Sequence, residues 1–416
     1  MKISATLLLL AFLLGMMVAV QPALAAEFHV TNATEFQNAL DKAENNGEDD
    51  IIYLAAGTYK GNFEYIPLDT EHKSLTITNE PGVPATQIIL DGQNNYTTLR
   101  LYDWSSGAEA NIVINGITIQ NGESPDNGGG IYAAMAYYNI TITNCIVKNS
   151  TAKRYGGGIY VDTHKNITLE NNQVYNNKTL GDPDRNLSRG GGVALITPFG
   201  NYTVRNNIIA WNQATGNVDN VEGGGLWVGW SSRNIIYLIG NTIYGNEALN
   251  GNGGGLYISF AETAYVYNNI VYANEASSGK DIYIHDEVTS RIAYNNDYSD
   301  VWGSWTEEGS NLNVDPQLVD PAGYDFHLKS TSPVIDKGTA NVPDPPGLPS
   351  TDFEGDPRII GAAPDIGADE ASVTPPAVGG EVTPTIWTMI TPITLLVVML
   401  IVALLALLRK VFPVKP

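Results

Sequence analysis

The sequence predicts an all-β solenoid in which short strands form successive coils that stack into parallel sheets. Two signals repeat along the chain: a glycine run followed by an apolar and usually aromatic pair, and then asparagines at fixed spacing. The glycine runs begin at Gly128, Gly156, Gly190, Gly223 and Gly253, with a degraded copy at Ser278. The asparagines lie at Asn144, Asn172, Asn207, Asn241 and Asn269, and five residues later at Asn149, Asn177, Asn212, Asn246 and Asn274. A period of about 30 residues with strand-like interiors indicates one coil per repeat.

The residue types of the repeat explain the geometry of the predicted coil. Short segments rich in Ile, Val, Thr and Tyr, with alternating apolar residues, are typical of half-buried strands. Glycine reaches backbone angles closed to other residues, so it permits the sharp turns between strands. Asparagine tolerates left-handed turns, and its amide can bond an identical amide one coil away, at about 4.8 Å. We therefore interpret the asparagines as turn and ladder residues rather than as catalytic groups.

The solenoid is predicted to span residues 26–310 and to begin with a capping helix. Residues 33–46 have a helical pattern with Phe36, Ala39, Leu40 and Ala43 on one face. Thr34 and Gln37 match a capping box, and Gly47 would end the helix. Such a helix covers the open edges of the first coil. The first, less regular coils contain strands predicted at 51–54, 75–78, 88–90, 99–101, 112–114 and 117–119.

Residues 311–370 are predicted to form a C-terminal cap. They are rich in Pro and Asp and lack the coil period. Their motifs are DPQLV from Asp315, YDFHLKSTSPVIDKG from Tyr324, DFEGDPR from Asp352 and DIGADE from Asp365. Residues 371–385 form a spacer of Pro, Gly, Thr and Val that follows this cap.

The two ends of the sequence predict export and a membrane anchor. Residues 1–25 combine Lys2, an apolar run and an Ala-Leu-Ala end, as in a secretory signal cleaved before Ala26. Residues 386–408 are apolar enough for a transmembrane helix, and the basic tail 409–416 favours a cytoplasmic C-terminus. The alternatives are a processed sorting signal and a buried core helix. We expect an ectodomain at the cell surface, anchored by a single pass.

Composition restricts the partners. The net charge is −22 and the estimated pI is 4.4, which argues against nucleic-acid binding. An acidic surface suits a soluble exposed protein, a salt-rich setting or cation binding. The single cysteine, Cys145, has no partner for an internal disulfide and is expected to be a small packed side chain. We expect a monomer that requires no cofactor.

Two family resemblances follow from these motifs. The coils resemble right-handed parallel β-helix repeats, and their glycine and asparagine pattern is similar to that of polymorphic outer-membrane proteins. In that family a Phe precedes the asparagine, in the pattern F-x-x-N, whereas Ile or Val occupies that position here. That family also ends in a β-barrel, whereas this chain has a predicted membrane helix, so autotransport is not implied. The 311–370 segment, with S-P-x-I-D-x-G and D-I-G-A-x-E, resembles choice-of-anchor domain proteins, in which a secreted β-helix precedes a variable anchor.

An aromatic column is the predicted ligand surface. After each glycine run, strand alternation points Ile131 and Ala133 and their equivalents inward, and the residue between them outward. The outward rings are Tyr132, Tyr160, Trp227, Tyr257 and Tyr283, with Ala194 in the third coil. Such a stripe would stack against the sugar rings of an extended polysaccharide. The alternative is an aromatic ladder that only stabilises the sheet. If the rings are exposed, replacing Trp227 and Tyr257 by Ala should leave folding intact.

Two longer coils suggest a weaker hypothesis of calcium binding. The insertions lie between Asn177 and Gly190 and between Asn212 and Gly223, where they would border the aromatic column. They carry Asp182, Asp184, Asp219 and Glu222, hard oxygen ligands of the kind that Ca²⁺ uses. The alternative is a pair of solvated acidic loops, because no dense calcium-loop motif is present.

Catalysis is the alternative to binding. A polysaccharide lyase needs a base and a charge that stabilises the substrate carboxylate; the candidates are Arg205, Arg233, Lys280 and His285. They lie on different coils and do not converge. A hydrolase needs two carboxylates, and only Asp162 follows the aromatic column closely. The leading hypothesis is therefore a surface protein that binds extended glycans or other polymers without turnover. The alternatives are a pectate-lyase-like polysaccharide lyase and a structural or adhesive spacer.

Overall fold

The computed structural model describes residues 25–294, 296–307 and 310–371. The predicted signal sequence, apart from Ala25, and the predicted transmembrane segment 386–408 lie outside these residues. Within the described ranges, no helix combines the length and apolarity that a membrane crossing requires.

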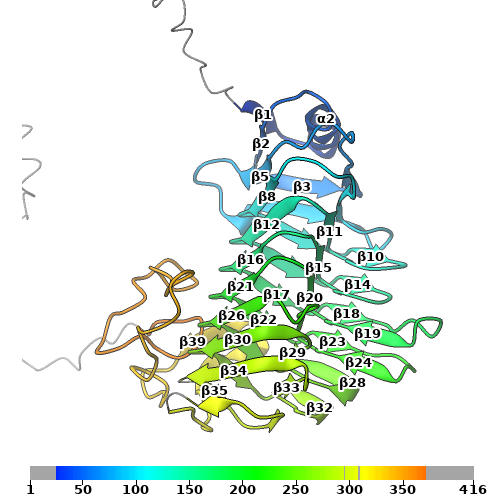
Figure 1. Cartoon of the computed structure of the whole chain (residues 1–416). Coiled ribbons are helices and arrows are strands. Elements are labelled where there is room, and N and C mark those ends of the chain that lie inside the picture. The colour runs from blue at the N-terminus through cyan, green and yellow to red at the C-terminus, as the bar shows by residue number, and fades with distance from the viewer. Residues whose placement is uncertain (1–24, 295, 308–309, 372–416) are drawn as a thin grey trace, which may run out of the picture. The chain divides into compact units, whose positions relative to one another are not determined.

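Apart from one antiparallel pair, the described strands form four parallel sheets, because successive coils stack their strands in register (Figure 1). Sheet I contains β1 (Ala26–Val30), β2 (Asp50–Leu54), β5 (Leu75–Asn79), β8 (Ala110–Asn115), β12 (Tyr138–Thr143), β16 (Ile167–Glu170), β21 (Tyr202–Arg205), β26 (Ile235–Ile239), β30 (Ala261–Tyr267), β34 (Val288–Tyr294) and β37 (Thr306–Glu307). Sheet II contains β3 (Gly57–Lys60), β6 (Ile88–Asp91), β9 (Thr118–Gln120), β13 (Ile146–Lys148), β17 (Gln173–Tyr175), β22 (Ile208–Ala210), β27 (Thr242–Tyr244), β31 (Ile270–Tyr272) and β35 (Asp297–Tyr298).

The other two sheets flank the glycine runs. Sheet III contains β4 (Phe63–Tyr65), β7 (Leu99–Asp103), β11 (Ile131–Met135), β15 (Ile159–Asp162), β20 (Val193–Ile196), β25 (Leu226–Val228), β29 (Leu256–Ile258), β33 (Ile282–Ile284) and β36 (Val301–Trp302). Sheet IV contains β10 (Glu123–Ser124), β14 (Thr151–Ala152), β18 (Lys178–Thr179), β19 (Leu187–Arg189), β23 (Gln213–Ala214), β24 (Asn220–Glu222), β28 (Glu247–Asn252) and β32 (Glu275–Ser278). The predicted β-solenoid is confirmed, and all six strands predicted in the first coils are present.

One apolar core fills the interior of the coils. The predicted inward residues after each glycine run are at most 1% exposed: Ile131, Ala133, Ile159, Val161, Val193, Leu195, Leu226, Val228, Leu256 and Ile258. The glycine runs form the turns from sheet IV to sheet III. The first glycine of each run has a φ of 61° to 67°, which L-residues rarely adopt. The second has no room for a side chain, since a Cβ on Gly157 would lie 2.2 Å from the carbonyl oxygen of Gly191.

The predicted capping helix is present as α2 (Ala33–Ala43), and the four predicted apolar residues on its inner face are buried. The predicted capping box is wrong. Asn32 is the N-cap and accepts a hydrogen bond from Glu35 N (3.0 Å), while Glu35 accepts one from Thr31 N (2.8 Å). Gln37 instead exchanges hydrogen bonds with the backbone of Glu64 in β4. The helix ends at Ala43, earlier than the predicted end before Gly47, and Glu44 is its C-cap.

Two ladders of buried asparagine side chains connect the coils. One flanks sheet II on the sheet I side and runs through Asn172, Asn207, Asn241, Asn269, Asn296 and Asn311. The other, at the opposite edge of sheet II, runs through Asn177, Asn212, Asn246 and Asn274 and ends on Asp281.

Each step of a ladder uses the same three hydrogen bonds. Asn177 N and Nδ2 both donate to Asn212 Oδ1, at 3.0 and 3.0 Å, and Nδ2 also donates to the carbonyl of Val147 at 2.9 Å. A side-chain amide is thus satisfied inside the protein, which removes the large penalty for burying it.

The structure separates the two roles that we predicted for asparagine. In the pairs Asn171-Asn172 and Asn176-Asn177, the first residue is left-handed, with a φ of 56°, and the second joins the ladder. Asn144 and Asn149 occupy the left-handed positions, with φ values of 53° and 54°, and so they do not align with the buried ladders. Asn144 still bonds amides of neighbouring coils, as predicted, but on the exposed side: it donates to Asn115 Oδ1 (2.8 Å) and accepts from Asn171 Nδ2 (3.3 Å). Their neighbours Cys145 and Ser150 stand at the start of the two ladders, and only their backbone N–H groups donate to the first ladder asparagines, Asn172 and Asn177, each at 3.0 Å.

The segment 311–370 begins by closing the last coil, where Leu312 pairs with Asp297. It then packs along the outer face of sheet II. Leu318, Phe326, Leu328, Val334, Ile366 and Ala368 form an apolar cluster with Ile208, Ala210 and Ile270 of that sheet. The segment includes η2 (Pro321–Gly323) and the antiparallel pair β38 (Leu318–Asp320) and β39 (Asp325–Leu328). The other short 3-10 helix, η1 (Ala85–Gln87), belongs to the first coils and lies before β6. The segment thus covers the side of the solenoid as well as its end.

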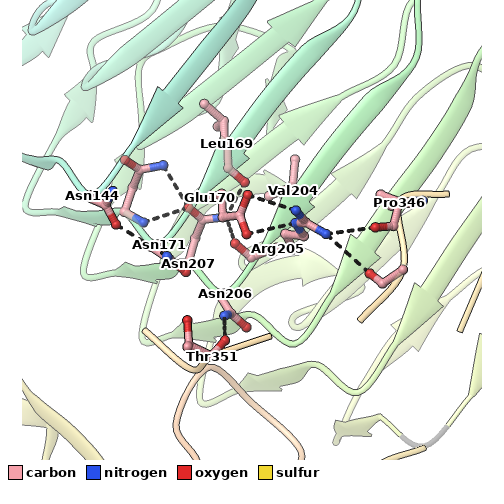
Figure 2. Close-up of polar contacts among 12 residues, drawn as sticks. Asn144, Leu169, Glu170, Asn171, Val204, Arg205, Asn206, Asn207, Pro346 and Thr351 are labelled. Carbon is pink, nitrogen blue, oxygen red and sulfur yellow. Dashed lines mark hydrogen bonds and ion pairs between the residues drawn. The ribbon is translucent and has the colours of Figure 1, made fainter. Parts of the chain in front are cut away.

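Polar contacts fix this segment to the corner of sheets I and II (Figure 2). Arg205 binds both carboxylate oxygens of Glu170 at 3.0 Å and donates to the carbonyl of Pro346 at 2.9 Å. Asn206, a left-handed residue, donates to the carbonyl of Thr351 at 2.5 Å. A second left-handed asparagine, Asn268, exchanges two 2.8 Å hydrogen bonds with the backbone of Thr339.

The acidic side chains of the segment accept hydrogen bonds from its own backbone. Asp352 Oδ1 accepts hydrogen bonds from three successive N–H groups, those of Glu354, Gly355 and Asp356. Glu370 accepts from Asp365 N (2.8 Å) and Ile360 N (3.0 Å). Arg358 is 2% exposed, and its guanidinium donates to the carbonyls of Asp365, Gly367 and Ala368. Side chains here take the place of a β-ladder as backbone partners.

We expect Asn212→Ala to destabilise the protein by about 2–4 kcal/mol, because it leaves buried partners in two coils without hydrogen bonds. Asn171→Gly is the matched control: it keeps a left-handed residue outside the ladder and should change stability by less than about 0.5 kcal/mol. Urea denaturation followed by circular dichroism measures both. Equal losses would contradict the separation of roles.

Candidate binding face

The predicted aromatic column lies on the outer face of sheet III, in the register that the sequence indicated. Tyr132, Tyr160, Ala194, Trp227, Tyr257 and Tyr283 pair in succession. The stack continues to Trp302 of β36, which was not among the predicted rings. Its C-terminal half is the more regular: the centroids of Tyr257 and Tyr283 are 4.8 Å apart, and those of Tyr283 and Trp302 are 4.3 Å apart, with interplanar angles of 5° and 3°.

The expectation that this column is exposed is wrong for its central rings. Tyr160, Trp227 and Tyr257 are 6%, 1% and 4% exposed and form a small apolar cluster with Ala194 and Ile196. Tyr132 and Tyr283 are half-buried. Strand alternation correctly gave the direction of these side chains, but their solvent exposure depends on what covers the sheet.

The cover comes from sheet IV and the turns that lead out of it. Trp227 Nε1 donates to Glu222 (3.0 Å), which forms an ion pair with Arg189 (2.7 Å). The Arg189 guanidinium lies over Trp227, 5.2 Å from the ring centroid, and also contacts Tyr155. The two long coils therefore do border the column, as predicted, but they close over it rather than form the wall of a groove.

The four acidic residues of the calcium hypothesis have separate partners. Asp182 is 5% exposed and forms ion pairs with Lys153 (2.9 Å) and Arg154 (4.0 Å), and Glu222 pairs with Arg189. Asp219 accepts a hydrogen bond from Asn186, and Asp184 donates its N–H to Asp182. The structure does not bring them into one cluster, and a cation would have to displace basic side chains from two of them.

The ends of the column remain open. Trp302 is 40% exposed at the C-terminal end. At the N-terminal end, Arg100 lies over Tyr132, 5.6 Å from its centroid, and both line a cleft of about 300 Å³. Tyr96, which also lines this cleft, is 54% exposed.

A second row of rings lies beside the first, at the turn from sheet III to sheet I. Within the described residues, seven successive strands of sheet III are each followed, within three residues, by an aromatic or imidazole ring. These rings, the corner row, are Trp104, Tyr137, His164, Phe199, Trp230, Phe260 and His285. Ring centroids are 5.2 Å apart for Trp104 and His164, and 5.3 Å apart for both His164–Phe199 and Phe260–His285.

The corner row is the exposed one. Phe199, Trp230 and Trp104 are 69%, 47% and 46% exposed, although large apolar side chains favour burial. Trp230 also contacts the buried Trp227, at 6.4 Å between centroids, so the two rows adjoin. This row was not predicted, because its members follow the strands at offsets of one to three residues. Such irregular spacing gives no periodic signal, although a ring in each turn could have been noticed.

The candidate catalytic residues do not form an active site. Asp162 accepts a hydrogen bond from the Tyr160 hydroxyl (3.1 Å), and burial raises its pKa. Its register neighbours on adjacent strands are Ala134 and Ile196, so this column provides no second carboxylate.

The four basic candidates are also dispersed. Arg205 is held by Glu170 and Pro346 at the corner of sheets I and II, and Lys280 pairs with Glu275 at the edge of sheet IV. Arg233 is exposed in the turn before β26, and His285 belongs to the corner row. As predicted, these groups do not converge.

A match to one family model supports the architecture. A family model described as the right handed beta helix region matches residues 84–238. Two solved structures are similar at low identity. A pectin methylesterase from carrot is 12% identical, with a TM-score of 0.30, over 64% of this chain and 89% of that one. The PL6 family alginate lyase AlyGC is 14% identical, with a TM-score of 0.22, over 71% of this chain and 54% of that one. No curated protein matches the chain.

We expect Trp227→Ala to destabilise the fold by about 3–5 kcal/mol, because it opens a cavity under Arg189 and removes one of the two partners of Glu222. Phe199→Ala should change stability by less than about 0.5 kcal/mol, because that ring is exposed. The midpoints of urea denaturation compare the two variants. A small effect of Trp227→Ala on stability would contradict the burial of Trp227 and favour an aromatic column that is open to solvent.

Proposed function

We propose that this protein is an exported, membrane-anchored β-helix that binds extended glycans without turnover, and that the corner row is its binding surface. The observation that carries the proposal is the succession of rings on consecutive coils, with three of them about half exposed or more. The apolar ends of the sequence and the motifs that resemble choice-of-anchor proteins support export and anchoring.

The spacing of the row suits a polymer rather than a small ligand. Successive coils lie about 4.8 Å apart, so an extended chain along the coil axis would meet a ring on every coil. A flat ring stacks on the apolar face of a sugar, while the surrounding hydroxyl groups stay in water. The cleft beside Tyr132, of about 300 Å³, has the size of a small-ligand site rather than of a polymer-binding surface.

The charge of the protein favours neutral polymers. A net charge of −22 repels polyanions over distances of about a Debye length. This repulsion also disfavours the alternative of a lyase for uronic-acid polysaccharides. Such a lyase would release unsaturated products that absorb in the ultraviolet, and we expect none from pectate or alginate. A chelator-sensitive signal of this kind would overturn the proposal.

We expect the double variant Phe199→Ala with Trp230→Ala to weaken glycan binding by about 1–3 kcal/mol, or about 5- to 150-fold in Kd, because two stacking rings are lost. Affinity electrophoresis in gels that contain xylan, galactomannan or hydroxyethyl cellulose measures this. Pectate and alginate serve as charged comparators.

Leu249→Ala is the matched control, because this apolar side chain of β28 is also exposed (45%) but lies on sheet IV. Its retention should equal that of the unmodified protein. No retention on any polymer, or equal retention of the double variant, would leave a structural or adhesive spacer as the better explanation.

Removal of residues 385–416 should release the protein into the medium, because it deletes the apolar segment and its basic flank. Fractionation of cells and medium measures the release. Mass spectrometry of the membrane-bound form separates a permanent helix, with a peptide ending at Pro416, from a processed sorting signal, without it. Protection of the ectodomain from protease added to whole cells would contradict both versions, provided that no outer envelope shields it.

A further inference from the structure

A histidine and two carboxylates from three separate parts of the 311–370 segment meet beside sheet II. His327 lies in β39, Glu354 follows the Asp352 turn, and Asp369 belongs to the last motif. One donor atom of each lies within 4.8 Å of the other two. Among the described residues, this is the only group of three such side chains with that spacing. A cleft of about 290 Å³ opens over them.

The imidazole is oriented by a further carboxylate. His327 Nδ1 lies 2.5 Å from Asp325 Oδ1, and Nε2 lies 2.6 Å from Glu354 Oε2. When Nδ1–H donates to Asp325, the lone pair of Nε2 faces Glu354 and Asp369. This is the arrangement by which carboxylates fix metal-binding histidines in other proteins.

Asp369 is the buried member of the group. Its residue is 5% exposed, and within the described part of the chain its carboxylate accepts one hydrogen bond, from Leu328 N at 2.7 Å. A carboxylate has about four acceptor sites, so most of its capacity is unused. A buried carboxylate with one neutral partner is costly unless a positive charge lies close by.

The neighbouring acidic side chains do not explain the group. Glu370 is committed to backbone N–H groups, and Asp352 likewise. Arg358 donates its hydrogen bonds to backbone carbonyl groups. The described residues that line the cleft include no lysine or arginine.

We propose that His327, Glu354 and Asp369 form a binding site for a divalent transition-metal cation, with Zn²⁺ as the preferred ion. One nitrogen and two oxygen ligands suit Zn²⁺, and they leave a fourth position for water from the cleft. The imidazole argues against Ca²⁺, which takes oxygen ligands. Zn–N and Zn–O bonds of about 2.0–2.2 Å require Nε2 and Oε2 to separate to about 3.3 Å, which the exposed side chain of Glu354 (48%) can accommodate.

The cation would connect β39 to the two turns that follow it. These parts are otherwise joined by few hydrogen bonds, such as Leu328 N to Asp369 and Phe353 N to Ala368. A metal that binds the folded state stabilises it by mass action. The site would therefore hold the segment together at the side of the solenoid.

Equilibrium dialysis of the full-length protein, purified without a histidine tag, against Zn²⁺ alone tests the proposal. We expect one equivalent to bind, and Glu354→Gln and His327→Gln each to weaken binding by at least about 10-fold. Asp325→Asn should weaken it while leaving the three ligands in place. Co²⁺ in place of Zn²⁺ should give a visible absorption spectrum that His327→Gln alters.

Asp356→Asn is the matched control, because Asp356 lines the same cleft but is not one of the three donors. It removes the same charge as Glu354→Gln and should change affinity by less than about twofold. An equal loss in both variants would show diffuse attraction rather than a site. Failure to bind a stoichiometric ion, or equal competition by Ca²⁺, would overturn the proposal and leave a proton shared by His327 and its carboxylates as the explanation.

Discussion

The structure depends on the hydrogen bonds of its buried asparagine ladders. Each amide receives two donors from one neighbouring coil and donates to the next, so burial leaves it fully bonded. The ladders hold the coils in one register at both edges of sheet II, which no disulfide could do in a chain whose one cysteine, Cys145, is free. A coil that slipped by one residue would break both ladders at once.

Because the register is fixed, residues at equivalent positions of successive coils lie side by side and form a continuous surface. Because every coil repeats the same turns, a ring placed once per coil becomes a row. The aromatic column is covered by Arg189, Glu222 and Tyr155, which come from the longer coils and the turns of sheet IV. The corner row has no such cover and keeps Phe199 and Trp230 in solvent. The variable loops, rather than the repeats, decide which row of rings is exposed to solvent.

In the C-terminal segment, the backbone N–H and carbonyl groups are hydrogen-bonded in a different way. It lacks stacked coils, so the carboxylates of Asp352 and Glu370 and the guanidinium of Arg358 bind its N–H and carbonyl groups. Most of its acidic residues are thereby structural. His327, Glu354 and Asp369 differ because one donor atom of each lies within 4.8 Å of the other two.

The sequence by itself determined the solenoid, the burial of Ile131 and its equivalents, the inner face of α2 and the register of the aromatic column. These follow from local periodicity, which depends only on the alternation and repeat of neighbouring residues. Only the tertiary structure decided that Trp227 is buried, that Asn144 turns the chain while Asn172 joins the ladder, and that His327 meets Asp369. Such facts depend on segments far apart in sequence, whose approach no local pattern encodes.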